Sequence, residues 1–138
     1  FFVRKGLGAS RPDPDSTDFC LSLYDAPLPG WVGFSAMVVP FRRPATDMAP
    51  TDAKAACLYP NGARATAWAV ERGHEMAVLC DAAGNVAEFA SSNLWIAKDG
   101  VAITPAVNHT FLNGITRQRV IGLLRGAGVP VEERTIRP

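Results

Sequence analysis

The chain has 138 residues, of which 48% are hydrophobic and 20% charged, and its formal net charge is +1. A chain of this size and composition can bury one sizeable core without a disulfide or a bound metal, so we expect one domain. The near-neutral charge and scattered arginines give no basic stripe, which argues against nucleic acid as a partner, and no apolar run reaches the roughly 18 residues that span a bilayer. The cysteines are odd in number and form no C-x-x-C pair, so we expect a reducing compartment and a cytoplasmic protein.

The first half of the chain predicts a turn, strands and a helix in that order. Residues 11–16 read "RPDPDS", and each proline biases the residue before it away from helix. We expect strands over 19–26 and 34–43, paired through the proline- and glycine-containing segment between them. Pro60 is acceptable in a first helical turn, so a helix is expected over 61–74.

A run of strands should follow this helix. Short β-rich segments cover residues 75–81, 85–90 and 92–97, and the third turns at Asp99-Gly100 into residues 101–105. Because Asp-Gly is a strong hairpin signal, we interpret the whole run as a β-meander.

A second helix should begin at Thr116, whose hydroxyl can cap it, and end at Gly126 or Gly128. A last strand is expected over 129–136. The helix would bury an apolar face made of Val120, Ile121, Leu123 and Leu124. Together these elements predict an α/β fold, or an α+β fold with a mixed sheet.

Lys54 is unusual because the chain uses few lysines, and this one stands among alanines in "TDAKAACLYP". Taken alone, it has an ordinary explanation as a side chain that keeps its charged head in water. A glutamate in a strand, such as Glu88, is most often on the solvated face. Gly-Ile-Thr before a helix is most often a turn and a cap.

Order and spacing change that interpretation, because several motifs occur together. The chain resembles the class IV pyridoxal-phosphate aminotransferases, and the branched-chain amino-acid aminotransferase group in particular, from about Phe34 onward. The motifs that carry the resemblance are Lys54 with Tyr59, Glu88 with Asn93, Asp99-Gly100, Thr104-Pro105, and Leu112-Asn113-Gly114-Ile115-Thr116.

The resemblance implies a fold type IV, cofactor-binding large domain that is incomplete. Residues 1–138 would be a partial catalytic domain, with an amino-terminal lobe and a carboxy-terminal segment missing. It also implies pyridoxal 5′-phosphate as cofactor and a homo-oligomer as the working form. Phe41 and Arg42 stand where related enzymes carry a pocket aromatic and an arginine.

By this resemblance, Lys54 is the catalytic residue that anchors the cofactor as a Schiff base and moves a proton. Such an amine must be deprotonated, and desolvation by apolar neighbours such as Ala53 and Ala55 would lower the pKa of the lysine. Glu88 would hold the ring nitrogen protonated, and Tyr59 would bind the ring's phenolic oxygen. The other cofactor-binding residues implied are Asn93 and, at the start of a helix where backbone N–H groups attract phosphate, Gly114, Ile115 and Thr116.

The function implied is transamination of branched-chain L-amino acids (Leu, Ile, Val) with 2-oxoglutarate. Small amino acids and 2-oxo acids would be its substrates, with no membrane partner. The alternatives are D-amino-acid aminotransferase, aminodeoxychorismate lyase, or a non-catalytic binding module that has kept the fold. No metal site is expected, because His74 and His109 lack acidic or cysteine neighbours at ligand spacing.

Overall fold

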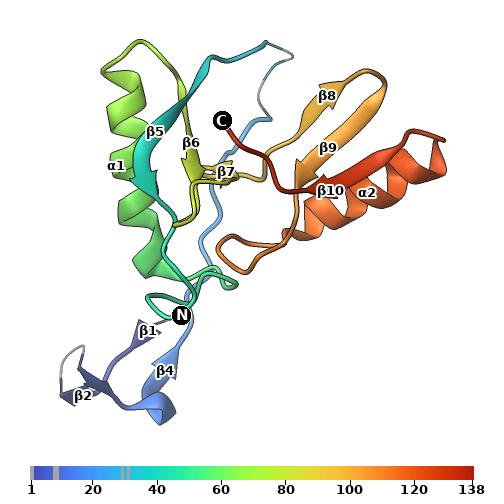
Figure 1. Ribbon diagram of the computed structural model, residues 1–138. Helices are drawn as coiled ribbons and strands as arrows, with labels where there is room; N and C mark the ends of the chain where they lie inside the picture. Colours follow the sequence, from blue (N-terminus) through green and yellow to red (C-terminus); the bar gives the residue numbers. More distant parts are fainter. Residues whose placement is uncertain (1, 8–9, 29, 31) are drawn as a thin grey trace. The chain divides into compact units, whose positions relative to one another are not determined.

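The computed structural model describes residues 2–7, 10–28, 30 and 32–138 of the chain. These residues fall into two compact units, one ending at Val32 and one beginning at Gly33. Figure 1 shows the chain coloured from its amino end to its carboxyl end.

The first unit is built from very short strands. One antiparallel pair joins β1 (Phe2–Val3) to β4 (Thr17–Asp18), and another joins β2 (Gly6–Leu7) to β3 (Arg11–Pro12). The predicted turn holds η1 (Pro14–Ser16), a single 3₁₀ turn. Hydrogen bonds tie this turn to the rest of the unit.

The strand predicted over residues 19–26 is wrong, because no regular secondary structure forms there. Leu21, Leu23 and Tyr24 are 75%, 94% and 83% exposed. An apolar run becomes a strand only where another strand and a core receive it, and the described residues supply neither to these side chains.

The second unit contains a mixed sheet in the order β5-β6-β7. β5 (Ala36–Arg42) confirms the strand predicted over 34–43, although its partner is β6 and not residues 19–26. β6 (Met76–Cys80) runs parallel to β5 and antiparallel to β7 (Val86–Phe89), so both strands that were predicted here are also confirmed.

Helix α1 (Tyr59–Val70) connects β5 to β6 and lies against one face of this sheet (Figure 1). Its Ala65 and Ala69 are fully buried against Val39 and Leu79. Alanine favours helix and lets the backbone of α1 approach the sheet closely. The helix predicted over 61–74 is therefore confirmed.

The remaining strands form a separate sheet in the order β10-β9-β8, so the predicted continuous β-meander is wrong. β8 (Ile96–Lys98) and β9 (Val101–Pro105) form the predicted hairpin, with Asp99 and Gly100 at φ of 51° and 77°. β10 (Val131–Arg134) then pairs parallel to β9.

The chain leaves the first sheet directly after β7. The Phe89 N–H donates to the Ser92 carbonyl (2.9 Å), and this tight turn ends the strand. Leu94 is then buried beside Val78 and Val86 on the first sheet, with Ile136 packed against the same cluster. The strand predicted over 92–97 is therefore regular only from Ile96, because residues 92–95 make the crossing between the sheets. The sequence did not predict this break, because it depends on contacts with Leu94 and Ile136.

Helix α2 (Ile115–Gly126) connects β9 to β10 and ends at the glycine that the sequence predicted. Thr116 is not its cap, because the N-cap is Gly114 and no side chain bonds the first turn. Ile121 is buried as expected, whereas Leu123 is 55% exposed. The buried stripe of α2 runs instead through Arg117, one turn before Ile121.

Candidate active site

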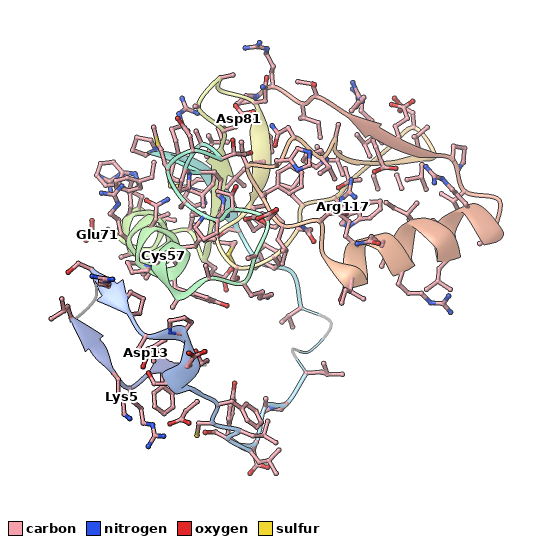
Figure 2. The ribbon with its side chains drawn as sticks, turned by 90° about the horizontal axis from the view of Figure 1, so that it is seen from below. Lys5, Asp13, Cys57, Glu71, Asp81 and Arg117 are labelled. Atoms are coloured by element: carbon pink, nitrogen blue, oxygen red, sulfur yellow. The ribbon has the colours of Figure 1, made fainter. Side chains whose placement is uncertain are left out.

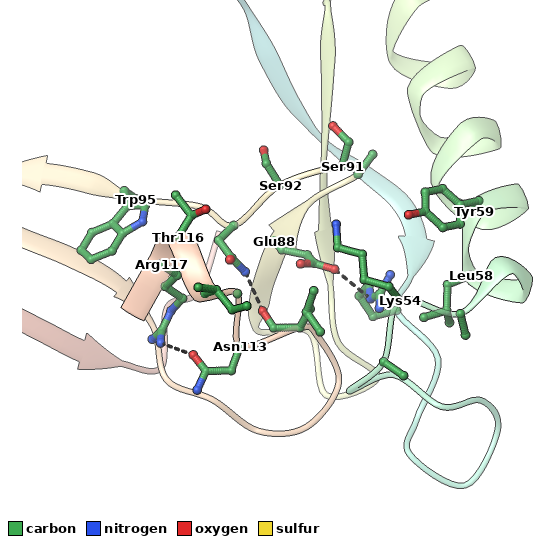
Figure 3. Close-up of a pocket in the computed structure, with 18 of the residues that line it drawn as sticks. Lys54, Leu58, Tyr59, Glu88, Ser91, Ser92, Trp95, Asn113, Thr116 and Arg117 are labelled. Carbon is green, nitrogen blue, oxygen red and sulfur yellow. Dashed lines mark hydrogen bonds and ion pairs between the residues drawn. The ribbon is translucent and has the colours of Figure 1, made fainter. Parts of the chain in front are cut away.

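A pocket of about 730 Å³ opens in the second unit and is lined by four parts of the chain. These are the end of β5, the loop that leads into α1, the end of β7 with the loop after it, and the start of α2 (Figure 3). The structure brings together every residue that the sequence analysis placed at a cofactor: Lys54, Tyr59, Glu88, Asn93, Gly114, Ile115 and Thr116.

Glu88 is the buried acid of this pocket, with 8% of its surface exposed. It lies on β7, opposite Leu79 of β6. Burial raises the pKa of Glu88 to about 7, and the nearby charges of Arg43 and Lys54 oppose that rise. The prediction that Glu88 is a site residue and not a solvated strand residue is thus consistent with its burial.

Arg43 is the nearest cation to this carboxylate. Its Nε lies 3.3 Å from Oε1 of Glu88, and both side chains are about nine-tenths buried. The same Nε donates a hydrogen bond to the Thr110 carbonyl (2.9 Å). The site therefore pairs a carboxyl group and a guanidinium cation within a largely buried wall.

Lys54 stands on the loop before η2 (Ala56–Leu58), and its side chain reaches into the pocket toward Glu88 (Figure 3). Ala53 and Ala55 line the pocket beside it. The lysine itself is exposed in this chain, so its alanine neighbours do not by themselves supply the desolvation that an apolar surrounding would give. Alanine side chains are too short to cover a lysine, and no other described element closes over it.

Tyr59 is the first residue of α1 and faces the same pocket, with its hydroxyl turned toward Lys54 in Figure 3. Its surface is 61% exposed. Pro60 follows in the first turn, where a missing N–H costs no helical hydrogen bond. The start of α1 therefore fixes the backbone of Tyr59 at the rim of the pocket.

The start of α2 presents backbone donors to the pocket. Its first helical bond runs from the Gln118 N–H to the Gly114 carbonyl (3.0 Å), so the N–H groups of Ile115, Thr116 and Arg117 cannot be bonded within the helix. The first turn also contains no acidic residue. The partial positive charge of a helix N-terminus is therefore not neutralised by its own side chains.

Asn93 shapes this helix start from the opposite side. Its Nδ2 donates to the Leu112 carbonyl (2.8 Å), which holds the loop before α2 against the loop after β7. Gly114 passes so close to the Asn93 side chain that any Cβ at that position would overlap Asn93 Oδ1. Asn93 therefore fixes the position of the backbone around Gly114.

Arg117, labelled at the start of α2 in Figure 2, lines the pocket, but its Nη2 donates to groups that do not line it. Its guanidinium donates to Asn113 Oδ1, to the Pro105 carbonyl and to Glu133 Oε2, each at 2.9 Å. These bonds tie the start of α2 to β9 and β10. Arg117 is thus a structural cation beneath the helix start.

The loop before α2 has a further anchor at the end of β6. Asp81 is buried, and its Oδ2 accepts hydrogen bonds from Nδ2 of Asn85 (2.9 Å) and Nδ2 of Asn108 (2.8 Å). Thr51 lies on the loop between β5 and η2 that carries Lys54, which we call the lysine loop, and its hydroxyl donates to the His109 carbonyl. Residues 108–110 therefore join the lysine loop, β6 and Arg43 to one another.

Sequence reasoning missed several of these groups, including Arg43, Ser91, Ser92 and Trp95. It expected Phe41 and Arg42 at the pocket, and neither lines it. Phe41 packs instead against Trp68 of α1, with ring centroids 5.7 Å apart. The register of β5 on β6 shifts between Val38 and Arg42, so counting along the strand does not predict which arginine faces the acid.

Comparison with known proteins identifies the family of the chain. Residues 3–138 match the family model described as amino-transferase class IV, and the chain belongs to that family. The resemblance drawn from the motifs is thereby confirmed, and the match begins well before the position near Phe34 where the motifs start. In the described part of the chain, no group of His, Cys, Asp and Glu is arranged to hold a metal ion. That same part contains no helix long and apolar enough to cross a bilayer.

Two curated relatives and one solved structure illustrate the similarity. A probable branched-chain-amino-acid aminotransferase from Aquifex aeolicus is 42% identical over 105 residues, covering 75% of this chain and 34% of the relative. The branched-chain-amino-acid aminotransferase of Escherichia coli K12 is 31% identical over 138 residues, covering 95% and 44%. A crystal structure of an aminotransferase from Brucella abortus bound to the cofactor PLP aligns with a TM-score of 0.89 at 46% identity, covering 99% of this chain and 49% of that chain.

These comparisons confirm the predicted mixed α/β, fold type IV architecture. The chain spans less than half the length of the curated relatives described above.

Proposed function

We propose that the protein containing this chain is a pyridoxal-phosphate-dependent aminotransferase that acts on branched-chain L-amino acids with 2-oxoglutarate as acceptor. The observation that carries the proposal is the meeting of Lys54, Glu88 and the start of α2 in one pocket. The similarity to branched-chain aminotransferases supports the substrate class.

The residues of the pocket fit this cofactor by their chemistry. An amine is present for the aldehyde, a buried carboxylate for the ring nitrogen, and N–H groups without a helical partner at a helix start for the phosphate. When bound, pyridoxal phosphate would supply an electron sink for the electrons released as the amino acid loses its Cα proton.

Each proposed role follows from position. Lys54 would hold the cofactor covalently and carry the Cα proton, because it is the lysine on the pocket wall. Glu88 would keep the ring nitrogen protonated, and Tyr59 would donate to the ring's phenolic oxygen. Ile115 and Thr116 would bind the phosphate through their backbone N–H groups, at a backbone shaped by Asn93 and Gly114.

The exposure of Lys54 supports a working site that is completed by further protein. Removal of water favours the neutral, nucleophilic form of a lysine amine, and the described residues leave Lys54 open to water. We therefore propose a homo-oligomer in which other segments or subunits close the pocket, acting on small amino acids and 2-oxo acids. A cytoplasmic location remains our proposal.

The proposal is tested by adding leucine to the intact protein loaded with pyridoxal phosphate and recording the absorbance of the cofactor. Conversion to the amine form of the cofactor with L-leucine, and recovery with 2-oxoglutarate, is the expected result. Conversion with D-alanine alone would favour a D-amino-acid aminotransferase, and pyruvate release from aminodeoxychorismate would favour the lyase. A protein that gives no cofactor absorbance would be a non-catalytic binding module.

A further inference from the structure

The ion pair between Arg43 and Glu88 has an uncommon geometry. Arg43 Nε approaches Oε1 of Glu88 to 3.3 Å, yet its hydrogen bond goes to the Thr110 carbonyl at 2.9 Å. Within the described residues, neither Glu88 oxygen receives a hydrogen bond. Glu88 is therefore attracted by a cation while its acceptor sites remain available.

Both side chains are largely buried, which strengthens the electrostatic attraction between them. Side-chain exposure is 7% for Arg43 and 10% for Glu88. Charges removed from water interact more strongly than surface pairs, and a buried carboxylate without a partner would take up a proton. Lys54 is the other cation that acts on Glu88, but it is exposed and therefore better screened.

Arg43 differs from Lys54 in that its positive charge is permanent, as well as in being buried. A guanidinium stays protonated at any pH at which the protein is folded, whereas a lysine that forms a bond to an aldehyde no longer has its free amine. The bond to Thr110 also holds the Arg43 side chain in place without help from Glu88. The cation is thus fixed before any ligand enters.

We propose that Arg43 is a positioning residue that favours the ionised form of Glu88 by charge alone and leaves its oxygens free to accept a hydrogen bond from a cationic ring nitrogen. The inference rests on the proposed function, since it takes Glu88 as the group that meets a cofactor ring. Arg43 does not itself touch the ring in this account. It acts through the carboxylate.

The test is the titration of Glu88 in the intact protein without cofactor. The protein is labelled with ¹³C at the glutamate carboxyl groups, and the chemical shift of Glu88 is recorded as a function of pH. The Glu88 signal is assigned by its absence from the spectrum of Glu88→Gln. Arg43→Gln removes the charge and retains a donor for the Thr110 carbonyl, and it should raise the pKa of Glu88 by ~1 unit or more. Arg43→Lys keeps a cation and should leave the pKa within a few tenths of a unit of the wild type. Arg42→Gln is the matched control, because Arg42 is exposed and does not line the pocket.

An unchanged Glu88 titration in Arg43→Gln, or an equal shift in Arg42→Gln, would overturn the inference. If Arg43→Gln does not fold, Arg43→Lys decides, because a shift of ~1 unit or more despite the retained charge would contradict a role by charge. A separate titration of the wild type with pyridoxal phosphate tests the proposed function. Failure to bind would refute that function and leave the result on Arg43 standing.

Discussion

Gly114 and Asn93 fit against each other so closely that the glycine leaves no room for a side chain. A Cβ on Gly114 would overlap Oδ1 of Asn93, whose Nδ2 is held by the Leu112 carbonyl at 2.8 Å. The two residues come from separate motifs, one after β7 and one before α2. Their contact explains why both motifs are needed to shape the start of α2.

Gly114→Ala should therefore push Asn93 off the Leu112 carbonyl and displace the start of α2. Overpacking of this kind costs ~1–3 kcal/mol of unfolding free energy, and we expect weaker phosphate binding as well. Gly122→Ala is the control, because a Cβ at Gly122 would meet nothing within 4 Å and alanine favours helix. Urea unfolding should show a loss for the first variant and a gain of up to ~1 kcal/mol for the second. Equal effects of the two changes would show that the contact with Asn93 is unimportant.

The sequence predicts local features of this region well and tertiary ones poorly. Strand and helix periodicity located β6, β7 and both helices, and motif spacing selected residues that do line one pocket. Periodicity did not show that β7 and β8 enter different sheets, because the break depends on packing by Leu94. It also missed Arg43, since the register shift in β5 changes which arginine reaches Glu88.

Glu88→Gln should stabilise the cofactor-free protein at alkaline pH. The folded pKa of about 7 lies above the ordinary value of 4.5, so folding becomes less favourable as pH rises between those values. Each unit of such a difference is worth about 1.4 kcal/mol, so the variant should be more stable by up to ~3 kcal/mol near pH 8 and by little near pH 4. Denaturant unfolding across this range measures the difference. A constant difference at all pH values would contradict the raised pKa.

The same change should slow transamination sharply. A neutral amide cannot hold the ring nitrogen protonated, and loss of a strong electrostatic partner in an active site raises the barrier by ~2.7–4 kcal/mol. Half-reaction rates with leucine in the loaded protein measure this effect. Rates equal to those of the wild type would mean that Glu88 does not act on the cofactor.

Asp81→Asn should destabilise the fold most at neutral pH. Burial alone would raise the pKa of Asp81, but hydrogen bonds from Asn85, the Ala83 backbone and Asn108 hold it below its usual range. The carboxylate therefore contributes stability above its unfolded pKa of about 4, and this contribution falls as pH drops through the folded pKa. We expect a loss of ~1.5–3 kcal/mol near pH 7 that shrinks near pH 3. Asp99→Asn, in the exposed β8–β9 turn, should change stability little at either pH.

Thr51→Val should loosen the lysine loop. The Thr51 hydroxyl is buried and donates to the His109 carbonyl, so valine keeps the shape and leaves that carbonyl without its donor. A cost of ~1–3 kcal/mol in unfolding free energy is expected, together with slower attachment of pyridoxal phosphate in the intact protein. Thr51→Ser keeps the hydroxyl and should retain most of the attachment rate. If valine and serine behave alike, the hydrogen bond does not position the loop.

Lys54 is the residue proposed to bind the cofactor covalently. Borohydride reduction of the intact protein loaded with pyridoxal phosphate makes the bond between a lysine amine and the cofactor aldehyde permanent, and peptide mapping then locates it. The pocket geometry predicts the label on Lys54, and Lys54→Ala should remove the label and nearly all transamination while leaving the fold intact. A label on Lys5 or Lys98 in the wild-type protein, with Lys54 unmodified, would contradict the account.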